Sequence, residues 1–185
     1  MLIELSKNFP LSIYSPSYAI GFIELLRVLG KRFAYSVLNN TGAGKAYLNG
    51  KMMPVLPVNI KLKKYLSAPV FGIDMFNVLY NSEIVLNIHA DSSPIYASNM
   101  RLFEATGVGS CLLTDKKQNI SDLFEVDKEI IVYESVEDCI EKIRWLLSHK
   151  TVFKSIAEAG QTRCLREHTY DNRVPTFIQK LEKYL

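Results

Sequence analysis

Short apolar runs alternate with amphipathic stretches along the chain, which predicts strands and helices in turn. The clearest example spans residues 84–114, where an apolar run over 84–88, a polar loop and a short helix ending near Gly107 precede a second apolar run over 111–114. Apolar runs this short, on either side of a helix, are typical of buried parallel strands. In such sheets, ligands bind beyond the carboxyl ends of the strands and at helix N-termini. The polar residues that fall in this zone are Asn87, His89, Ser98, Asn99, Arg101 and Glu104.

The first part of the chain shows the same alternation. We expect a strand over 11–14, a helix that begins at Pro16 and stops at Gly30, and a second strand over 33–38. This order predicts a right-handed β-α-β unit with a parallel pair of strands. Residues 1–10 carry little signal and are expected to form an N-terminal tail.

Caps and apolar stripes predict the remaining elements. Ser135, followed by Asp138 three residues later, is similar to a capping box and predicts a helix start. The other expected elements are a loop over 39–45, a hairpin turn at Asn49-Gly50, a short helix over 60–66, a helix capped by Asp74, a helical turn over 120–124, a strand over 129–133, a helix over 152–167 and a last helix that is capped by Asp171 and holds Pro175 in its first turn. The alternation predicts one α/β domain over residues 1–185, a three-layer sandwich with a mainly parallel sheet.

Composition narrows the class of protein. With 48% hydrophobic and 22% charged residues, the chain has the means to bury a core and lacks the composition of a disordered protein. A net charge of +3, without a basic cluster interleaved with aromatic residues, argues against nucleic-acid binding. Three widely spaced cysteines, Cys111, Cys139 and Cys164, favour a reduced, cytoplasmic setting over a disulfide framework. No apolar segment reaches the roughly 20 residues of a membrane span, whereas peripheral contact with a membrane stays open.

A glycine-rich stretch over residues 42–45 invites a phosphate-loop interpretation. That loop requires a glycine four residues before the Gly-Lys pair and a serine or threonine after the lysine. Asn39 and Ala46 stand at those positions. We therefore reject a magnesium-binding nucleotide loop and expect an ordinary turn.

Glu104 follows a strand and a polar loop by one turn of helix. A carboxylate at such a place can bind the vicinal diol of a ribose, while the helix N-terminus at Ser98 to Arg101 can bind phosphate. The Arg101 guanidinium can donate two parallel hydrogen bonds to that phosphate. The alternative is that Arg101 and Glu104 form an ion pair at i,i+3 on the helix surface, and the spacing alone favours this alternative.

The three histidines show no metal-ligand spacing with each other or with cysteine. His89 lies just past a strand end, where it can bind a sugar or phosphate or be satisfied by nearby backbone. His149 and His168 lie near helix ends and are expected to cap them. No set of nucleophile, histidine and acid is indicated, so the catalytic residues stay unassigned.

Four stretches carry a family resemblance: SEIVLNIH, RLFEATGVGSCLLTD, DLFEVDKEIIVYESVEDCIEKIRWLL and IAEAGQTRCLREHTYDNR. Together they resemble the C-terminal domain of GT-B glycosyltransferases, most closely the "glycosyl transferases group 1" type of spore-maturation-like and polysaccharide-assembly proteins. The resemblance covers about residues 70–180, and the β-α-β opening fits the start of the same domain more loosely. It implies a Rossmann-like domain that binds a nucleotide-sugar donor.

The resemblance also implies roles for particular residues. Glu104 occupies the place of the glutamate that holds the nucleotide ribose, and Ser98 to Arg101 occupy the place of the amides that face the diphosphate. Residues 171–185 are similar to a final helix that crosses back towards a separate N-terminal domain. Many relatives carry another acidic residue seven or eight positions before the ribose glutamate, and Ala97 and Tyr96 stand there instead.

The resemblance therefore implies the donor-binding half of a hexosyltransferase-type enzyme that moves a sugar from a nucleotide diphosphate sugar to an acceptor hydroxyl. The acceptor glycan or lipid would bind a separate N-terminal domain, so we expect donor binding without transfer unless that half is supplied. No metal or other cofactor is expected, because helix dipoles and basic side chains such as Arg101 or Lys45 would stabilise the leaving group. Retention at the anomeric carbon is favoured by the resemblance alone.

Two other functions stay open at this point. A non-catalytic nucleotide-binding or scaffold domain of a glycan-assembly protein has the same sequence features, as does an unrelated α/β nucleotide binder. The sequence does not indicate the base, the sugar, the acceptor or the oligomeric state.

Overall fold

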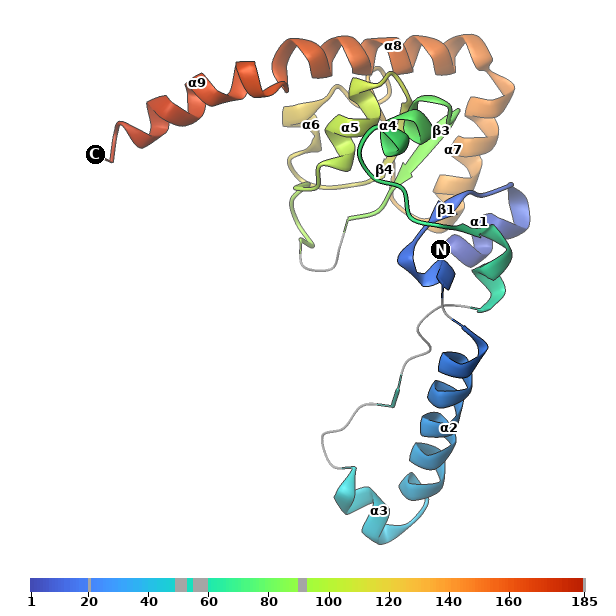
Figure 1. Ribbon diagram of the computed structural model, residues 1–185. Coiled ribbons are helices and arrows are strands. Elements are labelled where there is room, and N and C mark those ends of the chain that lie inside the picture. The colour runs from blue at the N-terminus through green and yellow to red at the C-terminus, as the bar shows by residue number, and fades with distance from the viewer. Residues whose placement is uncertain (20, 49–52, 55–59, 90–92, 185) are drawn as a thin grey trace. The chain divides into compact units, whose positions relative to one another are not determined.

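The computed structural model describes residues 1–19, 21–48, 53–54, 60–89 and 93–184 (Figure 1). The chain divides into two compact units, Met1–Val70 and Phe71–Leu185, where the sequence predicts one domain over 1–185. Both units contain parallel strands, so the predicted α/β class is confirmed. The predicted hairpin at Asn49-Gly50 lies outside the described residues.

The elements of the first unit are, in order, α1 (Leu2–Asn8), β1 (Ile13–Tyr14), the 3-10 turn η1 (Pro16–Ala19), α2 (Phe22–Asn39), α3 (Gly42–Tyr47), the 3-10 helix η2 (Ile60–Tyr65) and β2 (Leu66–Ser67). The expected N-terminal tail is wrong, because α1 buries Leu5 completely. The Tyr65 hydroxyl also donates to the Ser6 carbonyl of α1 at 2.6 Å. A buried leucine and a long-range hydrogen bond hold this segment in place.

The predicted strand over 33–38 is wrong, because α2 continues through Gly30 to Asn39. Apolar residues at 23, 26, 29, 33 and 37 keep the helical spacing across the glycine. Glycine inside a helix costs only about 1 kcal/mol relative to alanine, which is too little to end it. The parallel partner of β1 is therefore β2, with Ile13 opposite Leu66, and not the predicted segment.

The loop predicted over 39–45 is also wrong from Gly42 onward, because α3 begins there. The Thr41 side chain accepts a hydrogen bond from the Gly44 amide at 3.0 Å, as an N-cap does. A Cβ atom at Gly44 would overlap the Leu38 carbonyl at the end of α2. The glycine thus permits the tight connection between α2 and α3.

The second unit has the elements α4 (Gly72–Tyr80), β3 (Ile84–Asn87), α5 (Arg101–Gly107), β4 (Cys111–Asp115), α6 (Ile120–Leu123), β5 (Ile131–Tyr133), α7 (Val136–Ser148), α8 (Lys150–Glu167) and α9 (Tyr170–Leu181). The strands form a parallel sheet in the order β3-β4-β5. Asn87 lies opposite Thr114, and Asp115 lies opposite Tyr133. The carboxyl ends of all three strands therefore meet at one edge of the sheet.

Apolar residues from β4 and its covering helices form the core of this unit. Leu112 and Leu113 of β4 are completely buried, as are Leu102 of α5 and Phe124 after α6. Helices α5 and α8 pack against β4 and against each other, and α7 packs against β5. This packing confirms the strands and helices predicted over 84–114 and fixes the start of α5 beside the sheet edge.

The predicted helix start is confirmed at α7 and differs from the structure at other helices. The helix predicted from Pro16 begins only at Phe22, because Pro16–Ala19 form the 3-10 turn η1. The Ser135 side chain accepts from the Asp138 amide at 3.1 Å and caps α7 as predicted. Helix α4 begins at Gly72, so Asp74 lies in its first turn and is not the cap. Thr169, not Asp171, caps α9, which places Pro175 beyond the first turn.

Candidate functional site

Polar side chains gather where the three parallel strands end. The Asn87 side chain at the end of β3 donates to the Thr114 hydroxyl of β4 at 3.0 Å. The Tyr133 hydroxyl at the end of β5 donates to the Asn87 carbonyl at 3.1 Å. All three residues are buried, and their hydrogen bonds join the strands at the edge where α/β sheets bind ligands.

Asn99 connects the loop before α5 to this edge. Its side-chain amide donates to Asn87 Oδ1 at 2.8 Å, and Asn87 Nδ2 lies 3.3 Å from Asn99 Oδ1 in return. The structure therefore brings these two predicted residues together. Ser98 is exposed beside them, and its hydroxyl donates to the Ser93 hydroxyl at 3.1 Å.

The loop that holds Ser98 and Asn99 is tied to the segment after β4. Asn119 accepts from the Ala97 amide at 2.6 Å and donates to the Ala97 carbonyl at 3.1 Å. Lys117 Nζ donates to the Pro94 carbonyl at 2.9 Å. At the two positions where the second acidic residue is missing, Ala97 is buried in the core and Tyr96 is exposed at the surface.

His89 lies two residues past β3 and is buried. Its Nδ1 atom lies 2.6 Å from Asp115 Oδ1, and its backbone amide donates to the same oxygen at 3.0 Å. Lys117 Nζ lies 3.2 Å from Asp115 Oδ2. Partial burial raises the pKa of the Asp115 carboxyl, but hydrogen bonds from His89 and Lys117 outweigh it and hold that pKa below its usual value.

Arg101 and Glu104 form the i,i+3 ion pair that the spacing favours. The Arg101 guanidinium lies 3.2 Å from Glu104 Oε2, and the glutamate side chain is 19% exposed. The contact engages one carboxylate oxygen and lies on α5, the helix that starts beside the sheet edge. Pairing with Arg101 and binding of a ribose are compatible, because a carboxylate accepts several hydrogen bonds.

Thr114, Asp115 and Tyr133 are members of this site that the sequence pattern does not single out. Each falls within or directly after a predicted strand, where an apolar run indicates only burial. Their signal lies in the register: a parallel pairing of 84–88 with 111–114 and 129–133 would bring polar residues at the three strand ends together.

The other two histidines have structural contacts. His149 Nδ1 lies 2.8 Å from the Trp145 carbonyl, which confirms capping of α7. His168 is the C-cap residue of α8, as predicted, with its backbone amide donating to the Cys164 carbonyl at 2.8 Å. Its ring Nε2 donates to the Leu123 carbonyl of α6 at 2.8 Å. Its ring lies 5.0 Å from both the Phe103 and Phe124 rings. The bond therefore joins two elements far apart in the sequence.

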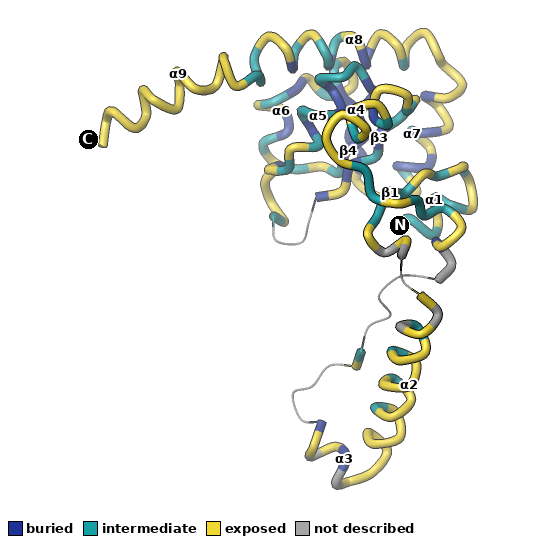
Figure 2. Tube along the Cα trace, viewed as in Figure 1, coloured by how far each residue is buried: buried dark blue, intermediate teal, exposed yellow. Residues whose placement is uncertain are grey.

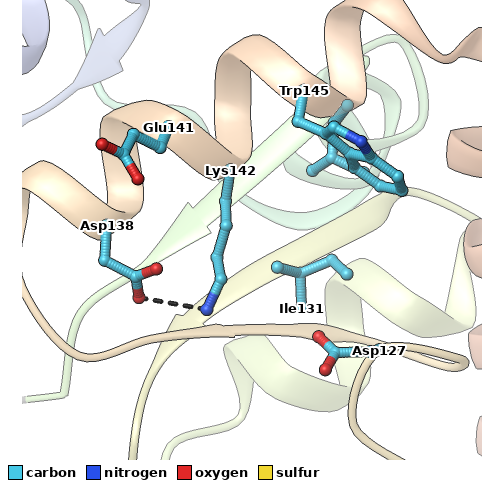
Figure 3. A pocket seen from close by; sticks show the side chains of 7 residues that line it. Asp127, Ile131, Asp138, Glu141, Lys142 and Trp145 are labelled. Carbon is cyan, nitrogen blue, oxygen red and sulfur yellow. Dashed lines mark hydrogen bonds and ion pairs between the residues drawn. The ribbon is translucent and has the colours of Figure 1, made fainter.

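A pocket of about 370 Å³ lies elsewhere on the second unit (Figure 3). Its lining residues come from α7, the first residue of β5 and the segment before that strand, and Lys142 pairs with Asp138, one turn earlier on α7, at 3.0 Å. Its lining consists of Asp127, Ile131, Asp138, Glu141, Lys142, Trp145 and Leu146. None of the predicted donor-binding residues lines it, so we place the candidate site at the sheet edge on chemical grounds.

The described residues contain no group of three or more histidine, cysteine or acidic residues positioned to hold a metal ion. In the same residues, no helix has both the length and the apolarity to cross a membrane. Cys111, Cys139 and Cys164 are free, buried thiols.

Comparison with known proteins gives one family. The family model described as glycosyl transferase-like matches residues 25–179. The solved structures that share the fold include Anabaena HepE in complex with UDP, at 13% identity and a TM-score of 0.56 over 94% of this chain and 47% of that one. They also include sucrose-phosphate synthase from Thermosynechococcus elongatus, at 9% identity and a TM-score of 0.55 over 99% of this chain and 49% of that one. This chain thus spans about half the length of each structure, and a comparison with curated proteins finds no match.

Proposed function

The chain belongs to the glycosyl transferase-like family, and we propose that it is the donor-binding half of a GT-B glycosyltransferase. The whole enzyme would transfer a sugar from a nucleotide diphosphate sugar to an acceptor hydroxyl. The α/β domain and the likeness to half of each of two larger proteins support this assignment. The UDP in the HepE complex supports a nucleotide as the ligand class.

The observation that carries the proposal is the polar cluster at the carboxyl ends of β3 and β4. It lies inside the matched range, at the start of α5, and combines an amide pair, a histidine and a carboxylate. Amides and carboxylates bind the hydroxyls of sugars, and cationic groups bind phosphates. The cluster therefore has the chemistry that a nucleotide sugar requires.

Within this proposal, Glu104 binds the ribose diol and Arg101 faces the diphosphate. The ion pair between them, at 3.2 Å, orients both the carboxylate and the guanidinium. When the sugar leaves, a nucleoside diphosphate carries the developing negative charge, and Arg101 stabilises it. We propose that this charge is stabilised without a metal ion or another cofactor.

The acceptor, a glycan or a lipid, would bind a separate N-terminal domain. Helix α9 has no buried residue, and Figure 2 shows it exposed along its length. Its apolar side chains Val174, Phe177, Ile178 and Leu181 give it a face suited to packing against that domain. We propose a cytoplasmic role in polysaccharide assembly, in which any membrane contact would be peripheral.

Calorimetric titration with UDP, GDP and other nucleoside diphosphates tests the donor site. We expect the native chain to bind at least one of them and Glu104→Ala to weaken binding about tenfold, the value of a charge-assisted hydrogen-bond pair. Glu104→Gln keeps a hydrogen-bond acceptor and should lose less. Glu158→Ala, at an exposed glutamate of α8, should bind as the native chain does.

Two results would contradict the proposal in different ways. Native binding that survives Glu104→Ala, in a variant that remains folded, would remove Glu104 from the site. The absence of binding to every nucleoside diphosphate would favour a scaffold domain that has kept the fold and lost the ligand.

A further inference from the structure

His89 and Asp115 form a buried contact at the centre of the sheet edge. Two hydrogen bonds converge on Asp115 Oδ1, from His89 Nδ1 at 2.6 Å and from the His89 amide at 3.0 Å. The His89 side chain has no exposed surface, and that of Asp115 is 20% exposed. A carboxylate that holds both the ring and the backbone of one residue fixes the direction of its imidazole.

The other ring nitrogen of His89 has no partner. Nε2 is buried, and no hydrogen-bond partner for it exists among the described residues. An unmet buried polar atom is destabilising, and most buried polar atoms in folded proteins are paired. His89 follows β3, whose last residue Asn87 belongs to the amide pair, in the zone beyond the strand ends where α/β sheets bind ligands.

We propose that Asp115 is a positioning residue of the donor site: it holds His89 through Nδ1 so that Nε2 meets the diphosphate of the nucleotide sugar. This inference rests on the proposed donor function and adds the group that orients the phosphate contact. Because Nε2 is covered, a bound diphosphate would displace whatever polypeptide covers this atom.

The protonation state follows from the chemistry of the two partners. Diphosphate oxygens only accept hydrogen bonds, so Nε2 must carry a proton to meet them, and Nδ1 already donates to Asp115. In the complex the ring would donate from both nitrogens, which requires the imidazolium form, and the Asp115 carboxylate stabilises that form. Asp115 is suited to this role, because its contacts with His89 and Lys117 hold its pKa below the usual range.

Lys117 and Tyr133 are the other ionisable side chains at this edge. Lys117 pairs with the second oxygen of Asp115 at 3.2 Å. Burial raises the pKa of the Tyr133 hydroxyl of β5 far above its usual value, with the Asp115 charge adding to the effect. Thr114 and the two asparagines do not titrate. Replacement of His89 itself therefore measures the part that its imidazole takes in proton uptake.

Calorimetry of UDP binding, in buffers of different ionisation enthalpy, measures affinity and proton uptake together. We expect net proton uptake by the native chain when UDP binds, because two anionic partners favour the imidazolium. His89→Gln should abolish the uptake. Asp115→Asn, whose side-chain oxygen can still accept both His89 hydrogen bonds, should weaken UDP binding about tenfold and reduce the uptake.

Glu134→Gln is the matched control, because it makes the same change in an exposed acid that pairs with Lys116 at 2.7 Å. It should leave affinity and proton uptake unchanged. Loss of binding in Glu104→Ala, with native affinity and uptake in Asp115→Asn and His89→Gln, would overturn this inference and leave the donor proposal in place. A native chain that binds no nucleoside diphosphate would overturn both.

Discussion

At the scale of single residues, Gly160 marks a close backbone contact between α8 and the segment before β5. A Cβ atom at this position would overlap the Glu129 carbonyl and approach the Thr106 side chain. Gly160→Ala gains about 1 kcal/mol of helix propensity, yet overpacking against backbone costs about 1–3 kcal/mol. We expect a net loss in the free energy of unfolding, measured by urea titration with the fluorescence of the single tryptophan, Trp145.

Gly107 supplies the matched control on the facing helix α5. A Cβ atom there would meet Cys164 Sγ at 3.6 Å, an ordinary van der Waals distance. Gly107→Ala should therefore leave the free energy of unfolding within about 0.5 kcal/mol of the native value. Equal losses in both variants would show that Gly160 is not a site of close approach.

His168 makes the stability of the second unit depend on pH. Desolvation holds the pKa of His168 below its usual value, the Arg173 and Arg163 charges add to this, and the bond to the Leu123 carbonyl opposes it. The unfolded chain therefore binds the proton first as the pH falls. Stability is complete above the unfolded pKa of about 6.5 and is lost as the pH falls from there through the folded pKa.

Thermal unfolding between about pH 7.5 and 5.5 checks this dependence, in a window that lies above the titration of carboxyl groups. His168→Gln should lower stability at the higher pH and flatten the decline. His149→Gln, at an exposed capping residue, should retain the native slope. A slope that survives His168→Gln would assign the pH dependence to another group.

The candidate site could be predicted from sequence only where a residue lies on a loop or at a helix start. Asn87 and Asn99 come together as expected, and Arg101 pairs with Glu104. Asp115 escapes the pattern, because it looks like the polar end of an apolar strand until the register places it beside His89. Its role depends on a contact across 26 residues of sequence, which periodicity does not report.

At the scale of elements, prediction succeeds where several signals agree. The strands over 84–88 and 111–114 are bounded by polar loops and separated by a helix, and all three form as predicted. In the first unit, Gly30 alone predicts a helix end, but the apolar spacing continues to Val37 and α2 runs through the glycine. The two-residue strand β2 at Leu66–Ser67 carries too few residues for a pattern, so its pairing with β1 depends on tertiary contacts.

Helix α9 has no buried residue, so substitutions in it should change the free energy of unfolding little. Phe177 is 61% exposed, so Phe177→Ser should change the free energy of unfolding by less than about 0.5 kcal/mol. Leu102→Ala on the buried face of α5 should cost about 2–5 kcal/mol. Urea titration of both variants checks the contrast, and a large loss for Phe177→Ser would show that α9 packs against this chain in solution.

At the scale of the whole molecule, the chain matches about half of each similar structure, at 47% and 49% of their lengths. Sugar transfer requires donor and acceptor to be held together, since proximity and orientation supply about 7–11 kcal/mol of the barrier reduction. If a second domain binds the acceptor, a chain that holds only the donor lacks this contribution. This chain should therefore bind the donor nucleotide without catalysing sugar transfer.

We predict that the 185-residue chain binds a nucleoside diphosphate but does not release it from the corresponding nucleotide sugar above the uncatalysed rate. Calorimetry measures the first quantity, and chromatography of the free nucleoside diphosphate, with and without a glycan acceptor, measures the second. Glu104→Ala serves as the control for binding. Turnover by the native chain that Glu104→Ala abolishes would place the complete catalytic cleft within these residues, because only a site that also orients the acceptor accelerates the transfer.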